Sequence, residues 1–297
     1  HQGFQVFDER LEAEMDFVER RADLTTDAAL EWLEQNAQPP FFLWVHYFDP
    51  HSSYIPPAEF ADMFIPANDV VGRFMRPYDE NGPVPEGYSR VKDRMFPSDV
   101  FEFTRAALYA GEVAFMDSEI GRLVDHFKKE NLYSKTLFLA VGDHGEKLTE
   151  KEHGELFKHN TVYEEVARVP LIIKLPGRGG KKVVTGRPAC TLDVAPTVLD
   201  ALGVLESEGI PAETFAGVSL AQAARGAGRP GEGKDIPPAA DRPVFFEASQ
   251  RMGAGVKLNG FKYMHFTRDT KGYADNTVRE RLYNLELDPA EKYNLAE

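Results

Sequence analysis

The sequence predicts an α/β protein with one large domain and a smaller C-terminal unit, and three patterns carry this prediction. Two apolar runs, 136–141 and a second that ends at Pro176, are typical of strands, and the uncharged first run suits a strand buried on both faces of a parallel-type sheet. Apolar residues recur at helical spacing between Thr104 and Lys129. Short alternating segments near the C-terminus indicate an antiparallel sheet.

The elements before the first central strand can be placed from their start and stop signals. Thr25 or Thr26 can cap a helix that must end before Pro39 and Pro40. The apolar run 41–45 then predicts a further strand. Residues 58–100 contain several glycines and prolines and are expected to form a long irregular segment.

The most regular pattern in the chain is an apolar stripe that predicts a helix from about Thr104 to Lys129. Its members recur at spacings of four and three residues: Tyr109, Val113, Met116, Ile120, Leu123 and Phe127. The stripe is expected to face the core. Asn131, which follows two lysines, is expected to close the helix.

Asp143 and His144 directly follow the first central strand, in the hexapeptide Val-Gly-Asp-His-Gly-Glu. Open α/β sheets bind their ligands at the carboxyl ends of strands, and both side chains can bind a divalent cation. The same two residues also fit a simpler interpretation, in which Asp143 caps the next segment and His144 is an ordinary loop histidine.

A second candidate site follows the run 41–45, where His46 and His51 flank the predicted end of a strand. The alternative is a hydrogen-bonded loop, because the residues around His51 are rich in turn formers. The sequence alone leaves both interpretations open.

The C-terminal part changes character. A helix is expected to open at 191–197 and end near Gly203, with Asp193 and Asp200 as caps or surface charges. The Gly- and Pro-rich stretch 226–242 is expected to link a core, 1–225, to a small subdomain, 243–297. Asn259-Gly260 between two alternating segments predicts a β-hairpin.

Composition excludes several classes of protein. The net charge of −14, from 34 Lys and Arg against 48 Asp and Glu, argues against nucleic-acid binding. No run approaches the ~18 apolar residues that a membrane span needs. Cys190 is the single cysteine, so no internal disulfide can form. The chain starts with His1, without an initiator methionine or a signal peptide, and is expected to be a piece of a longer protein.

Several short motifs occur in one order along the chain, and that order resembles the sulfatases of the alkaline-phosphatase-like superfamily. Each motif is weak alone, but together they span nearly the whole sequence: Phe48-Asp49-Pro50-His51, Gly142-Asp143-His144-Gly145-Glu146, Glu152-His153-Gly154, Tyr163-Glu164-Glu165, Arg168-Val169-Pro170, Leu192-Asp193 through Asp200, Gly217-Val218-Ser219-Leu220, and Leu282-Tyr283-Asn284-Leu285 with Asp288-Pro289 and Glu291.

The resemblance implies a mixed, largely parallel sheet sandwiched by helices, a small C-terminal antiparallel sheet, and hydrolysis of a sulfate ester at a divalent metal. Asp143 and His144 match one pair of metal ligands, and His51 matches the histidine that contacts the sulfate or protonates the leaving oxygen. Lys158 or His159 stands at a cationic position ahead of the Tyr-Glu pair.

The chemistry of these residues suits such a reaction. A sulfate or phosphate ester carries its charge on peripheral oxygens, so catalysis needs positive charge there and an acid for the leaving alkoxide. His46 and His153 are further candidates for contacting the substrate. Ca²⁺ is the first expectation for the metal, with Mn²⁺ or Mg²⁺ as alternatives.

The chain departs from the family pattern in one respect. Sulfatases carry a Cys or Ser-x-Pro-x-Arg segment, whose first residue becomes formylglycine, and an upstream Asp-Asp pair, and neither occurs in these residues. Cys190 lacks the following proline and arginine and is expected to be a small packing side chain. The 297 residues alone are therefore expected to be inactive, with the nucleophile in an upstream segment.

Three functions follow from the resemblance, in order of preference. The first is a sulfatase acting on a small-molecule or glycan sulfate ester. The second is a phosphodiesterase, phosphonate monoester hydrolase or phosphoethanolamine transferase, because related enzymes of these kinds carry Asp-His where many sulfatases carry Asp-Asn. The third is a non-catalytic fragment. The resemblance also suggests a bacterial periplasmic or extracellular protein.

Overall fold

The computed structural model describes residues 3–10, 20–51, 54–65, 98–148, 159, 161–177, 188–226, 242–248, 253–266 and 279–296, with backbone alone at 98–104 and 226. The chain divides into two compact units, His1–Tyr133 and Ser134–Glu297. The linker proposed at 226–242 lies almost wholly outside the described residues, so the domain boundaries drawn from the sequence stay a prediction.

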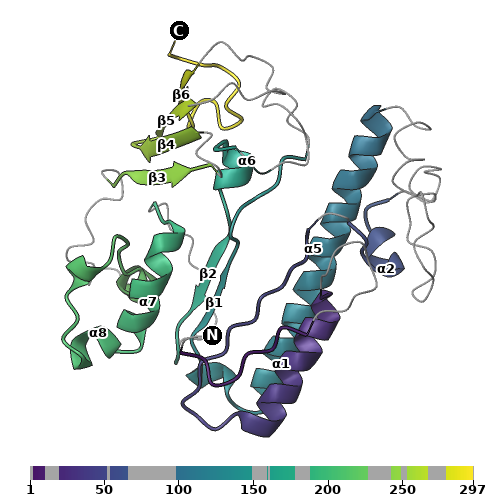
Figure 1. Cartoon of the computed structure of the whole chain (residues 1–297), viewed down its shortest axis with the longest axis vertical. Coiled ribbons are helices and arrows are strands. Elements are labelled where there is room, and N and C mark those ends of the chain that lie inside the picture. The colour runs from purple at the N-terminus through teal and green to yellow at the C-terminus, as the bar shows by residue number, and fades with distance from the viewer. Residues whose placement is uncertain are drawn as a thin grey trace. The chain divides into compact units, whose positions relative to one another are not determined.

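The described part of the first unit contains the helices α1 (Ala22–Asn36), α2 (Ala58–Ala61) and α5 (Ser98–Lys129), and α1 and α2 both pack against α5 (Figure 1). Helix α1 ends before the two prolines, as predicted. It begins earlier than expected, however, and Thr26 is buried inside it rather than capping it. The Thr26 hydroxyl lies 2.9 Å from the Tyr47 hydroxyl, so this polar side chain has a partner in the segment that follows the helix.

Helix α5 confirms the most regular sequence pattern and corrects its details. The helix begins at Ser98 because nothing between that residue and Thr104 breaks a helix. Its buried side is rotated from the predicted stripe: Val113 is 37% exposed, whereas Glu112 and Glu119 are buried. Five apolar residues complete that buried side among the described side chains of α5: Ala107, Leu108, Phe115, Leu123 and Phe127.

The strand predicted at 41–45 is not part of any ladder among the described residues. Exposure nevertheless alternates along 41–48, and Phe42, Trp44 and Phe48 are exposed by 61%, 68% and 40%. A two-residue alternation is the signature of an extended chain. The local sequence therefore sets an extended backbone, but a strand also needs a hydrogen-bonded neighbour, which the described residues do not supply.

Beyond α5 the chain forms a series of short elements: η1 (Tyr133–Lys135), β1 (Phe138–Val141), α6 (Glu164–Ala167), β2 (Leu171–Lys174), η3 (Thr191–Asp193), α7 (Val194–Ala201), α8 (Val204–Ser207), η4 (Ala212–Thr214), α9 (Ala221–Gly226), β3 (Val244–Glu247), β4 (Gly253–Leu258), β5 (Phe261–Phe266) and β6 (Glu280–Asn284). No helix in the described part of the chain has the length and apolar composition needed to cross a membrane.

Strands β1 and β2 confirm the predicted order of strand, polar segment and strand, but not the expected pairing. They run antiparallel, with Phe138 opposite Lys174 and Val141 opposite Leu171. Parallel strands need a long crossover, usually a helix, and the described part of the connection contains only the four-residue α6. The expectation that the run 136–141 is buried on both faces is also wrong, since Val141 is 41% exposed.

A buried carboxylate organises the segment after β2. Asp193 is fully buried, and its carboxylate accepts hydrogen bonds from the backbone N–H groups of Cys190 and Val218 and from both terminal nitrogens of Arg242. Burial by itself raises the pKa of this carboxyl, but the donors outweigh it and hold the pKa below 3.8. Asp193 is therefore an internal clamp and not a surface charge.

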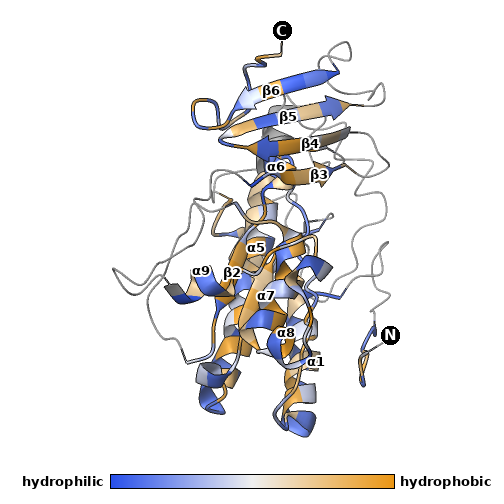
Figure 2. Ribbon diagram, turned by 90° about the vertical axis from the view of Figure 1, so that its left-hand side faces the viewer, coloured by the Kyte–Doolittle hydropathy of each residue, from blue (hydrophilic) through white to orange (hydrophobic). Residues whose placement is uncertain are grey.

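The C-terminal strands form an antiparallel sheet, as the sequence predicted, and their order in it is β3-β4-β5-β6. Asn259 and Gly260 have φ of 51° and 78°, and together they make the predicted tight hairpin between β4 and β5. Strand β5 carries both hydrophobic and hydrophilic residues (Figure 2), and burial alternates along it: Lys262, Met264 and Phe266 are buried, whereas Phe261 and Tyr263 are exposed.

Candidate functional site

The loop after β1 is held tightly against α6 and the residues before β2. The Gly142 N–H donates to the Pro170 carbonyl at 3.2 Å, and the Gly145 N–H donates to the Val166 carbonyl at 2.8 Å. A Cβ atom on Gly145 would lie 2.1 Å from the Glu165 carbonyl oxygen. Only glycine allows this approach, so the loop between the two glycines has a defined backbone.

Asp143 and His144 project from this loop. The His144 N–H donates to Asp143 Oδ1 at 2.8 Å, and His144 Nδ1 lies 2.9 Å from the Gly145 carbonyl. Because a carbonyl can only accept, Nδ1 is the protonated nitrogen, and the neutral imidazole keeps its lone pair on Nε2. That nitrogen lies 3.7 Å from Asp143 Oδ2, and the Asp143 side chain is 83% exposed.

This pair fits a divalent cation in both donor chemistry and spacing. Two ligand atoms that share one cation lie about 3 to 4 Å apart, and Asp143 Oδ2 and His144 Nε2 meet that condition. The backbone hydrogen bond to Nδ1 is the usual way in which a protein fixes the tautomer of a ligating histidine. Nowhere in the described ranges do three His, Cys, Asp or Glu side chains come together as a metal site, and the pair alone would form only part of a ligand set.

His159 lies directly beside this pair. Its ring stacks on the ring of His144 with centroids 4.4 Å apart and an interplanar angle of 25°. Its Nδ1 lies 3.5 Å from Glu146 Oε2, and the Glu146 side chain is only 13% exposed. The structure thus brings together three of the residues selected from the sequence, Asp143, His144 and His159. It adds Glu146, which the sequence offered only as the last letter of the motif.

The remaining candidates are distributed differently. Lys158 and His153 lie outside the described residues. His46 and His51 belong to the first unit, where His46 is exposed and the His51 ring lies 4.5 Å from that of Phe48. The loop after His51 is anchored to α5, because the Ile55 N–H donates to the buried Glu112 carboxylate at 2.5 Å.

The structure brings together a further group of residues that was not predicted as a cluster: Lys262, Glu164 and Glu291 meet in a buried ion cluster. In the sequence, Glu164 and Glu291 stand out only as members of the family motifs, and Lys262 lies in the alternating segment after Asn259-Gly260. The hairpin register could have indicated that Lys262 is buried, since it shares the inward face of β5 with Met264 and Phe266.

Comparison with solved structures defines the class of protein. A structure in complex with its substrate D-glucosamine-2-N,6-O-disulfate aligns with 94% of this chain and 66% of that chain, with a TM-score of 0.65 and 20% identity. The phosphonate monoester hydrolase from Silicibacter pomeroyi aligns with 91% of this chain and 57% of that chain, with a TM-score of 0.62 and 23% identity. The chain therefore has the alkaline-phosphatase-like α/β fold, as the motifs implied.

Sequence comparison narrows this class to one family. The family model for sulfatases matches residues 4–204. The choline-sulfatase of Rhizobium meliloti (strain 1021) is 29% identical over 273 residues, which cover 89% of this chain and 48% of that protein. The chain belongs to the sulfatase family, and it spans about half the length of this curated relative.

Proposed function

We propose that the protein hydrolyses sulfate esters at a divalent metal that Asp143 and His144 help to hold. The observation that carries this proposal is the pair itself: a carboxylate oxygen and an imidazole nitrogen 3.7 Å apart at the end of β1, in a chain of the sulfatase family. A metal bound there would stabilise negative charge on the oxygens of a tetrahedral anion.

The other site residues take roles around this pair. His159 binds a peripheral oxygen of the ester, and its stack on His144 favours it over Lys158 for the cationic position. His51 donates a proton to the leaving oxygen, while His46 and His153 contact the substrate. The proposed nucleophile is a formylglycine, and the Cys or Ser-x-Pro-x-Arg segment that carries it in sulfatases does not occur in these 297 residues.

The proposed metal is Ca²⁺, with Mn²⁺ and Mg²⁺ as alternatives. Carboxylate oxygens suit all three cations, whereas the imidazole of His144 shifts the preference toward Mn²⁺. Titration of the metal-free protein with each cation in a calorimeter separates these cases. Asp143→Asn is expected to weaken binding of the preferred cation by about 10- to 100-fold. Asp200→Asn, a carboxylate change in α7, is the matched control and is expected to leave the affinity unchanged.

The substrate is proposed to be a sulfate ester of a small alcohol or a sugar, and the compartment to be periplasmic or extracellular. The support for the substrate comes from relatives: one is a choline-sulfatase, and one neighbouring structure holds a sulfated glucosamine. Cell fractionation tests the compartment. Choline sulfate and glucosamine 6-sulfate are suitable first substrates.

Hydrolysis of a phosphonate or phosphate diester is the second candidate function. The Asp143-His144 pair and the fold shared with a phosphonate monoester hydrolase favour it. The deciding experiment compares kcat/KM for p-nitrophenyl sulfate, p-nitrophenyl phenylphosphonate and bis-p-nitrophenyl phosphate, using the protein at its full natural length with metal added. A preference for either phosphorus ester would overturn the sulfatase proposal, and no turnover together with no metal binding would favour a non-catalytic protein.

A further inference from the structure

A buried ion cluster joins three segments of the second unit that are distant in sequence. The Lys262 side chain on β5 is fully buried, and its Nζ lies 3.0 Å from Glu164 Oε1 and 2.9 Å from Glu291 Oε1. The Glu164 N–H at the start of α6 donates to Glu291 Oε2 at 2.6 Å. One cation thus connects three elements: β5 of the C-terminal sheet, the turn at 288–293 that contains Glu291 (the C-terminal turn), and α6.

The surroundings of the cluster make Lys262 difficult to replace. Its Nζ also lies 4.9 Å from the centroid of the Phe246 ring, so no side of the cation faces bulk water. Burial raises the pKa of Glu291. Burial also acts to raise the pKa of Glu164, but Lys262 and Lys257 outweigh it and lower that pKa. Removing the cation would leave two carboxylates in a dry site, which is strongly unfavourable.

The backbone at Glu291 supports a specific role for this contact. Glu291 has φ of 53°, a conformation that a residue with a side chain adopts only when its surroundings enforce it. The turn before it is fixed by Asp288, whose carboxylate accepts from the N–H groups of Lys292 and Tyr293 at 3.1 and 2.8 Å. The C-terminal turn therefore presents the Glu291 carboxylate to Lys262 and α6 in a fixed position.

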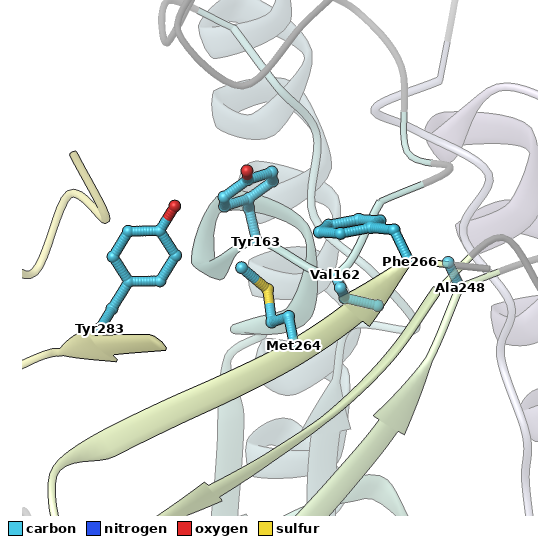
Figure 3. Packing of buried hydrophobic residues seen from close by; sticks show 6 residues of the cluster. All are labelled: Val162, Tyr163, Ala248, Met264, Phe266 and Tyr283. Carbon is cyan, nitrogen blue, oxygen red and sulfur yellow. The ribbon is translucent and has the colours of Figure 1, made fainter. Parts of the chain in front are cut away.

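A continuous set of contacts leads from this cluster to the candidate metal loop. Next to Glu164, Tyr163 packs in an apolar cluster with its neighbour Val162, with Ala248 directly after β3, and with three residues of the C-terminal sheet (Figure 3): Met264, Phe266 and Tyr283. Helix α6, fixed in this way, carries the Val166 carbonyl that accepts the Gly145 N–H at 2.8 Å. Gly145 in turn orients His144 through its carbonyl.

We propose that Lys262 is a positioning residue for the metal-binding loop, acting through Glu164 and α6 on the backbone of Gly145. This inference rests on the proposed function only in treating Asp143 and His144 as metal ligands. It assigns a catalytic purpose to the C-terminal sheet, namely to hold α6 against the loop. Lys257, which is 39% exposed, also pairs with Glu164, but no comparable effect is expected of it.

The test compares Lys262→Met with Lys257→Met in the protein at its full natural length. The first readout is amide hydrogen exchange at Gly145, which requires neither metal nor substrate. Lys262→Met is expected to speed this exchange by about tenfold or more relative to the Leu123 amide in α5, and Lys257→Met by less than about twofold. Equal acceleration of exchange at Gly145 and Leu123 would overturn the proposal, because Lys262 would then contribute only to global stability. No acceleration at Gly145 would also overturn it, because Lys262 would then have no effect on the loop.

The second readout is the dissociation constant for Mn²⁺ and Ca²⁺, which is expected to rise about tenfold in Lys262→Met and to stay unchanged in Lys257→Met. If the unsubstituted protein binds neither cation while Gly145 exchange still responds, the proposed function fails and the mechanical link stands. If Lys262→Met does not fold, Glu291→Ala replaces it, since Lys262 then keeps Glu164 as a partner. That variant is expected to speed Gly145 exchange about threefold, and no change would overturn the proposal.

Discussion

Gly145→Ala tests whether the close contact between the loop and α6 sets the geometry of the site. The new Cβ would lie 2.1 Å from the Glu165 carbonyl oxygen, whereas ordinary contact starts at 3.4 Å. The loop and α6 would have to separate by about 1 Å, which breaks the hydrogen bond from Gly145 to Val166. Steric strain of about 1–3 kcal/mol and a lost hydrogen bond of about 1 kcal/mol give a destabilisation of about 2–4 kcal/mol.

Thermal unfolding and calorimetric titration with Mn²⁺ and Ca²⁺ measure the two expected effects of Gly145→Ala. The melting temperature should fall by about 5–15 °C, and the metal dissociation constant should rise about tenfold or more. Gly217→Ala is the matched control, because its Cβ would lie 2.0 Å from the Leu192 carbonyl oxygen. It should lower the melting temperature similarly without changing metal affinity.

A glycine-to-alanine substitution without a steric clash serves as a second control for Gly145→Ala. A Cβ on Gly121 in α5 would meet nothing within 4 Å, so Gly121→Ala should stabilise the helix by about 0.5–1 kcal/mol. If Gly145→Ala retained both its melting temperature and its metal affinity, or if Gly217→Ala weakened metal binding equally, the loop geometry would not control the site.

Three further predictions concern the clamp, the proton donor and the hairpin. Asp193→Asn should destabilise the protein by about 2–4 kcal/mol, because it leaves Arg242 without its anionic partner. The folded-state pKa of Asp193 lies below 3.8, so its contribution to stability is present above that value and is lost as the pH falls through the folded-state pKa. Urea unfolding should therefore show that the free energy of unfolding falls less steeply at acid pH in the variant than in the unsubstituted protein. His51→Ala should lower kcat by about 10²- to 10⁴-fold while leaving metal affinity unchanged, and a parallel loss of metal affinity would contradict the role of proton donor. Gly260→Ala should destabilise by about 1 kcal/mol in the same unfolding assay, because Gly260 has φ of 78°, and an unchanged stability would argue against the hairpin geometry.

Much of the local structure could be predicted from the sequence, because it depends on neighbouring residues. Helix α5 ends at Lys129 as predicted, and the Asn259-Gly260 hairpin forms as expected, because both depend on local backbone preferences and short-range periodicity. The rotated buried side of α5 was not predictable, because Glu112 is buried by a contact with Ile55, which is distant in sequence.

In the candidate site, too, features set by neighbouring residues could be predicted and features set by long-range contacts could not. The adjacent pair Asp143-His144 could be selected from the sequence, because neighbouring residues at a strand end share a location. The stack of His159 on His144 could not be derived from their separation along the chain, because it depends on the tertiary position of the loop that the Gly145 contact with Val166 fixes.

The sequence by itself determined the membership of the sulfatase family, the order of strand, polar loop and strand, and the identity of Asp143 and His144 as candidate ligands. Only the tertiary structure decided that Asp193 is a buried clamp and that Lys262 joins Glu164 to Glu291. The physical reason is that a charge can be buried only when partners from distant segments lie beside it, and local sequence patterns contain no information on such long-range contacts.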